Sequence, residues 1–151
     1  MTLVDVLRAA EEDVLGEAEV ALGRAHLRHY DAAGIEESRS RLAHLFGLAV
    51  DCLADETLVP MSACGARVAA ERFRAGFSIG EVQTAFNVLE EAIWHVVVPR
   101  LELEELADAM GKIGTVLGVG RNALAQTWVS LASGEHVPSL DLTALFQGVS
   151  S

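Results

Sequence analysis

Helix-breaking residues are scarce in this chain of 151 residues, and that scarcity limits what the chain can fold into. The sequence holds only three prolines, Pro60, Pro99 and Pro138, so long stretches lie between residues that would interrupt a helix. Hydrophobic residues make up 51% of the chain but aromatic residues only 5%, so the apolar content is mainly alanine, leucine and valine. Such a composition favours long helices, and we predict an all-α protein.

Apolar residues recur at spacings of three and four along most of the chain, which is the pattern of amphipathic helices. The length suits one domain, and we predict a single helical bundle of five to six helices over residues 1–151. The tail, residues 135–151, is predicted to be a loop, with a short helix over residues 140–146 as an alternative. The main helices are expected at residues 3–31, 35–54, 60–75, 79–98 and 103–132.

Several residues carry local signals for the ends of these helices. The first helix can bend or break near Gly16 or Gly23, and Gly34 is the kind of residue that follows a helix C-terminus. Ser78 is the expected N-cap of the helix from residue 79, and Glu81, three residues later, completes a capping box. The apolar stripe of the last helix consists of Leu106, Met110, Ile113, Leu117, Leu124 and Leu131.

The charge of the chain excludes some partners. The net charge is −11 and the only lysine is Lys112, so the surface repels phosphate backbones and we expect no nucleic-acid binding. No uncharged run reaches the roughly 18 residues that span a bilayer, and the N-terminus lacks the basic start of a signal peptide. We therefore expect a cytoplasmic protein without membrane contact, in which Cys52 and Cys64 are buried free thiols.

The stretch LGVGRNA, residues 117–123, satisfies the G-x-G-x-x-A fingerprint of dinucleotide-binding folds. That fingerprint has meaning only after a strand, whereas here a helical rhythm passes straight through it. Gly111, Gly114 and Gly118 instead recur at spacings of three and four, which places them on one narrow helix face. We predict that another helix, from this chain or from a dimer mate, crosses there.

Candidate chemical groups are few. His26, His29 and His44 could surround a metal, and His95 could ligate a haem, but helix-end and surface histidines explain all four. No catalytic pattern is visible, and we expect no catalytic, cofactor-binding or metal-binding residue. Trp94 lies outside the apolar stripe of its helix, where an aromatic residue can mark a partner surface. With Gly111, Gly114 and Gly118 it is a candidate interface residue.

Two blocks of the sequence resemble a known family. ARVAAERFRAGFSIGEVQTAFNVLEEAIWHVV, within residues 66–98, and HLRHYDAAGIEESRSRLAHLFGLAVDCL, residues 26–53, are similar to the N-terminal domains of RsbR-type stressosome proteins and RsbRD-like regulators. The resemblance implies a non-haem, globin-like fold, a homodimer and a sensory role without catalysis.

The residues and the resemblance together predict a non-catalytic cytoplasmic signalling domain of a stress-response type. It is expected to be a homodimer that binds a protein partner or an unidentified small ligand, without a cofactor. The alternative, from a different functional class, is a helical sensor that binds haem or a metal through the histidines named above.

Overall fold

The computed structural model describes residues 1–134 of the chain. These residues form α-helices and two short 3-10 helices without any strand, which confirms the predicted all-α bundle. The predicted tail, residues 135–151, with its alternative helix over residues 140–146, lies outside the described residues. The elements are α1 (Leu3–Arg24), α2 (Arg28–Ala33), α3 (Ile35–Asp55), α4 (Val59–Arg74), α5 (Ile79–Val97), η1 (Val98–Arg100), η2 (Leu103–Glu105) and α6 (Leu106–Ser133).

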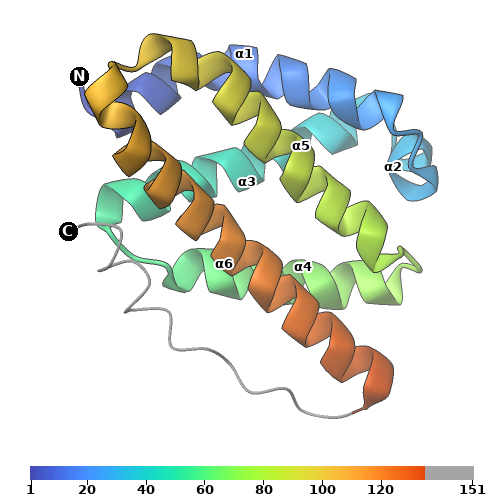
Figure 1. Ribbon diagram of the computed structural model, residues 1–151. Helices are drawn as coiled ribbons and strands as arrows, with labels where there is room; N and C mark the ends of the chain where they lie inside the picture. Colours follow the sequence, from blue (N-terminus) through green and yellow to red (C-terminus); the bar gives the residue numbers. More distant parts are fainter. Residues whose placement is uncertain (135–151) are drawn as a thin grey trace.

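The helices enclose one continuous core. α1 packs against α3 and α5, and α6 packs mainly against α4, which it crosses, and to a smaller extent against α5 (Figure 1). Every long helix contributes to the core because each has an apolar stripe at the helical period. The largest fully buried side chains include Leu7, Leu42, Phe46, Met61, Leu89, Ile93, Leu117 and Leu124.

The predicted first helix is in fact two helices, because the chain breaks just after Gly23, one of the two positions expected. α1 ends at Arg24, and His26 then adopts a left-handed conformation with φ of 51°. Leu27 is extended and α2 starts at Arg28. Gly34, with φ of 89°, ends α2 as predicted, since a residue without a Cβ adopts this conformation most easily.

The middle of the predicted apolar stripe of α6 is buried, whereas Leu106 is half-buried and Met110 and Leu131 are exposed. Ile113, Leu117 and Leu124 lie in the core, whereas Met110 is 56% exposed and Leu131 is also exposed. Met110 lies at the edge of the buried arc, and Leu131 lies in the last turn, where α6 extends past α4 (Figure 1). The periodicity therefore predicts the buried arc of this helix but not where its neighbours end.

A close contact between two glycines fixes the crossing of α4 and α6. A Cβ placed on Gly65 would collide with the carbonyl oxygen of Gly120 and would lie 3.1 Å from the Cβ of Ala123. A Cβ on Gly120 would lie 2.8 Å from Cε1 of Phe86 and 2.9 Å from Sδ of Met61. The two helices approach this closely because neither backbone carries a side chain at the crossing.

The crossing of α6 by another helix of this chain is therefore at Gly120, and not at Gly114 or Gly118 as the sequence suggested. Among residues 1–134, no heavy atom lies within 4 Å of a Cβ built on Gly114 or Gly118, so neither is closely covered by another helix. Gly120 follows Gly118 by two residues, a rotation of about 200° around the helix, and so faces the opposite side. A crossing by a dimer mate at Gly114 and Gly118 stays a prediction. The fingerprint LGVGRNA lies inside α6 and follows no strand in the described chain.

Two further expectations concern the chain as a whole. No helix within residues 1–134 is both long and apolar enough to cross a membrane. Cys52 and Cys64 are buried free thiols, as predicted, and burial raises the pKa of both thiols above its usual value. Both thiols therefore stay protonated and poorly reactive at neutral pH.

We expect the substitution Gly65→Ala to lower the free energy of unfolding by about 1–3 kcal/mol, because the new methyl group must displace the backbone of α6. Gly47→Ala is the matched control, since Gly47 lies inside α3 with no atom within 4 Å of a built Cβ. That control should gain about 0.5–1 kcal/mol from its better helix propensity. Urea unfolding followed by far-UV circular dichroism measures both variants. Equal stability of the two variants would contradict close packing at Gly65.

Candidate functional site

One side of α6 carries apolar and small residues that are exposed or only partly buried. Met110 and Val129 are 56% and 52% exposed, and Gly114 and Gly118 lie between them along the helix. Their spacings of three, four or seven residues place them on one face. We call this surface the α6 face, and it comprises Ala107, Met110, Gly111, Gly114, Gly118, Ala125 and Val129.

Arg121 is the one charged residue of α6 on the C-terminal side of Lys112, and its charge is neutralised within the chain. Its Nη2 atom donates a hydrogen bond to Oε1 of Glu90 on α5 at 2.9 Å. Both side chains are about three-quarters buried, so this ion pair is better shielded from solvent than a surface pair. The α6 face therefore presents almost no uncompensated charge.

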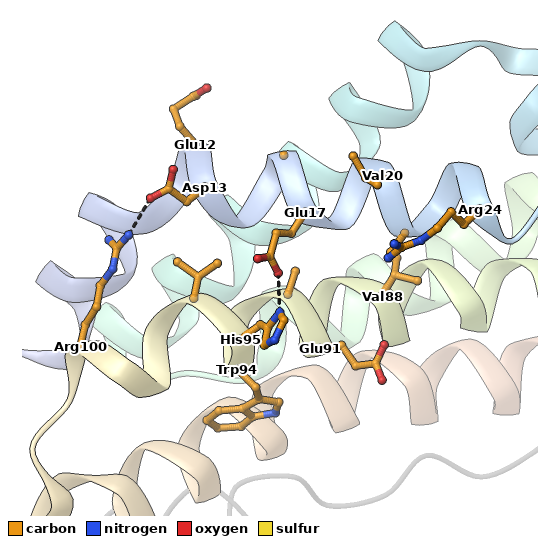
Figure 2. A pocket seen from close by; sticks show the side chains of 14 residues that line it. Glu12, Asp13, Glu17, Val20, Arg24, Val88, Glu91, Trp94, His95 and Arg100 are labelled. Carbon is orange, nitrogen blue, oxygen red and sulfur yellow. Dashed lines mark hydrogen bonds and ion pairs between the residues drawn. The ribbon is translucent and has the colours of Figure 1, made fainter.

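Trp94 lies on the side of α5 that adjoins the α6 face. α5 and α6 run antiparallel, and the contact between Glu90 and Arg121 sets their register (Figure 1). Trp94 lies one turn after Glu90, so it is level with the turn of α6 before Arg121, which contains Gly118. Figure 2 shows the Trp94 ring on the side of α5 away from α1, and the residue packs partly buried at the edge of the core. Candidate residues that the sequence identified separately thus adjoin one another.

An open groove of about 1160 Å³ runs along the surface between α1 and the C-terminal half of α5 (Figure 2). Two polar contacts bridge it: an ion pair in which Arg100 Nη2 lies 2.6 Å from Oδ2 of Asp13, and a histidine–carboxylate contact in which His95 Nδ1 lies 3.1 Å from Oε2 of Glu17. The groove is open and mixed in character, with the exposed Val20 beside charged side chains. Bridged and solvated in this way, it has the character of a surface channel rather than of an enclosed ligand pocket.

The histidines named as candidate ligands are spread over separate surroundings. His95 is 82% exposed in the groove, and a haem ligand would point into an apolar pocket instead. His26 and His44 are exposed, whereas His29 is partly buried against Glu81. Within residues 1–134 no group of three or more histidine, cysteine, aspartate or glutamate side chains is placed to hold a metal ion.

A second site, which the sequence did not predict, lies where α2 meets the N-terminus of α5. Helices α2, α3, α4 and α5 and the turn before α5 each send a side chain to this place. Both sequence blocks that carry the family resemblance contribute to it, one from each side. We call it the α2–α5 corner, and it comprises His29, Tyr30, Arg41, Arg72, Phe77 and Glu81.

His29 ties α2 to α5 at this corner. Its Nδ1 atom lies 2.9 Å and 3.1 Å from the two carboxylate oxygens of Glu81, and its ring stacks on Phe77 at 4.5 Å between centroids. The Ser78 side chain accepts a hydrogen bond from the backbone N–H of Glu81, which confirms Ser78 as the N-cap of α5. The second half of the predicted capping box is wrong, because the Glu81 carboxylate is directed to His29.

Two arginines complete the corner. The guanidinium carbons of Arg41 and Arg72 lie 5.8 Å and 5.5 Å from the centroid of Phe77, and Arg41 also lies 5.7 Å from the ring of Tyr30. Burial raises the pKa of the Tyr30 phenol, and the positive charge of Arg72 partly offsets that rise. The only sequence signal for this cluster was the coincidence of its residues with the two family-like blocks.

We expect Glu81→Gln to lower the free energy of unfolding by about 1 kcal/mol, because the charged contact with the partly buried His29 is lost while the N-cap hydrogen bond to the backbone remains. Glu91→Gln, on an exposed position of the same helix, removes the same charge and should change stability by less than about 0.5 kcal/mol. Thermal and urea unfolding measure both. A Glu81→Gln variant as stable as the control would show that the contact contributes nothing.

Comparison with known families identifies the chain. The sequence model of the family described as "RsbT co-antagonist protein rsbRD N-terminal domain" matches residues 3–133, which is almost all of the described part. No curated protein and no solved structure matches the chain. The match spans both of the resembling blocks and the helices that carry the α6 face and the α2–α5 corner. The chain therefore belongs to the family of RsbT co-antagonist protein rsbRD N-terminal domains, which are stress-signalling regulatory domains.

Proposed function

We propose that this regulatory domain acts without catalysis, as a cytoplasmic homodimer that joins through the α6 face and passes its signal to a protein partner or responds to a small ligand. The observation that carries this proposal is the α6 face itself. Within residues 1–134 no atom lies within 4 Å of a Cβ built on Gly114 or Gly118, and the exposed Met110 and Val129 lie on either side of these two glycines along α6. A face that combines exposed apolar side chains with room for a second backbone suits helix–helix association.

Charge favours a second copy of the chain as the occupant of this face. Each chain carries a net charge of −11, so two copies repel one another over most of their surfaces. Between residues 113 and 133 the only charged side chain is Arg121, which Glu90 neutralises. Like-charge repulsion is therefore smallest where the α6 face of one copy meets that of another.

The geometry of the face also suits a symmetric contact. α6 has 28 residues and is thus about 42 Å long, enough for two such helices to cross and bury a continuous patch. A two-fold axis near Gly118 would bring the same residues together from both copies, as an isologous interface requires. Trp94, level with Gly118, would then lie at the centre of the contact, where aromatic residues contribute most to binding.

The substitution Gly118→Gln tests this dimer. The wild type should have about twice the mass of one chain in sedimentation equilibrium, and the variant should weaken association at least tenfold, because its side chain holds the two helices apart. The monomer should tolerate the change, since a Cβ at Gly118 meets no atom within 4 Å.

Gly47→Gln provides the matched control, because Gly47 lies within α3 in similarly open surroundings. It should leave the dissociation constant unchanged. A monomeric wild type at high concentration, or equal association of both variants, would rule out a dimer through the α6 face.

The purified protein should show no Soret band and no stoichiometric metal, because His95 is 82% exposed and His29 is engaged by Glu81. An absorbance spectrum recorded before and after titration with hemin, together with elemental analysis, measures both properties. A Soret band that disappears in His95→Ala, or one bound metal per chain, would favour the haem- or metal-sensing alternative over the proposed function.

A further inference from the structure

The α2–α5 corner holds two guanidinium groups, each with a buried nitrogen atom that has no hydrogen-bond partner among residues 1–134. We propose that this corner binds an oxyanion, a carboxylate or phosphate group of a small molecule, between the guanidinium groups of Arg41 and Arg72. The site lies at the N-terminal end of α5, whereas Trp94 lies near the C-terminal end of that helix. This inference goes beyond the proposed dimer and does not depend on it.

Unpartnered donors are the first observation. Nη1 of Arg41 and Nε of Arg72 are buried, and neither has a hydrogen-bond partner among the described residues. A charged donor removed from water without an acceptor is costly, so such atoms call for a partner. A planar guanidinium presents its donors as a fork that fits the two oxygens of a carboxylate or phosphate.

The carboxylates next to these arginines compensate them poorly. Glu37 lies 3.2 Å from Nε of Arg41, and Glu71 lies 3.5 Å from Nη1 of Arg72, but both glutamates are more than half exposed. Exposed pairs between residues close in sequence contribute little. Arg121 also has one buried, unpartnered nitrogen, but its neighbour Glu90 is itself mostly buried and holds it at 2.9 Å.

Glu81, the mostly buried carboxylate of the corner, is occupied elsewhere. Both of its oxygens lie within 3.1 Å of Nδ1 of His29. His29 in turn stacks on the ring of Phe77, and the guanidinium carbons of Arg41 and Arg72 lie 5.8 Å and 5.5 Å from the centroid of the same ring. The two guanidinium groups thus share one aromatic neighbour, while the one mostly buried carboxylate of the corner contacts His29.

The remaining groups of the corner fit a small oxyanion. The phenol of Tyr30 is buried with a raised pKa, so it stays protonated at neutral pH and can donate its O–H. Arg41 and His29 are each about a quarter exposed, which gives access from solvent. Nη1 of Arg41 is itself buried, so a ligand would engage it after a rotation of the guanidinium. Access this limited suits a single carboxylate or phosphate group.

The test uses the full chain labelled with ¹⁵N, titrated separately with sodium phosphate, sodium acetate and sodium chloride at fixed pH and ionic strength. The arginine Nε–H signals are recorded by NMR, and Arg72→Gln assigns the signal of Arg72. We expect phosphate or acetate, but not chloride, to shift that signal saturably. Tighter binding of phosphate identifies a phosphate group as the ligand chemistry, and tighter binding of acetate identifies a carboxylate.

Arg41→Gln should weaken the binding of the preferred anion about tenfold, whereas Arg74→Gln, which removes an exposed arginine from α4, the helix of Arg72, should not. If neither phosphate nor acetate shifts the Arg72 signal in the wild type, or if chloride shifts it equally, the site does not exist. This wild-type result is decisive even where a variant fails to fold. The same titration of Gly118→Gln separates the site from the dimer, because anion binding should be unchanged there.

Discussion

The contact between the backbones of Gly65 and Gly120 determines where the other surfaces of this domain lie. Because α4 and α6 touch without an intervening side chain, α6 is drawn onto α4 with its Gly120 side inward. The opposite side of α6, which bears Gly114 and Gly118, is then left facing outward. Any side chain at Gly65 would move α6 and with it the α6 face. The exposed surface is thus a consequence of how tightly the opposite surface is packed.

Sequence periodicity predicts the helices well, because the pattern of apolar residues is a local property. The start of α5 after Ser78 and the break after Gly23 both follow from residues within one turn of the event. The choice of glycine at the crossing could not be predicted in the same way. Gly114, Gly118 and Gly120 all lie within seven residues of one helix, and only the position of α4 decides which of them is covered.

The α2–α5 corner shows a second limit of reasoning from sequence. His29 and Glu81 are 52 residues apart, so no spacing rule connects them. Locally, Glu81 has the position of a capping-box residue, and a tertiary contact overrides that role. The two family-like blocks contained the cluster, but as separate motifs they gave no sign that Arg41 and Arg72 share the ring of Phe77. A motif identifies the residues, whereas the fold determines which of them meet.

The corner and the α6 face are joined by adjacent residues of α4. Arg72 points to Phe77 in the corner, and its neighbour Phe73 packs edge-to-face on Trp128 of α6 at 5.4 Å between centroids. Trp128 directly precedes Val129, an exposed member of the α6 face. The same turn of α4 therefore packs both against the corner and against the C-terminal half of α6.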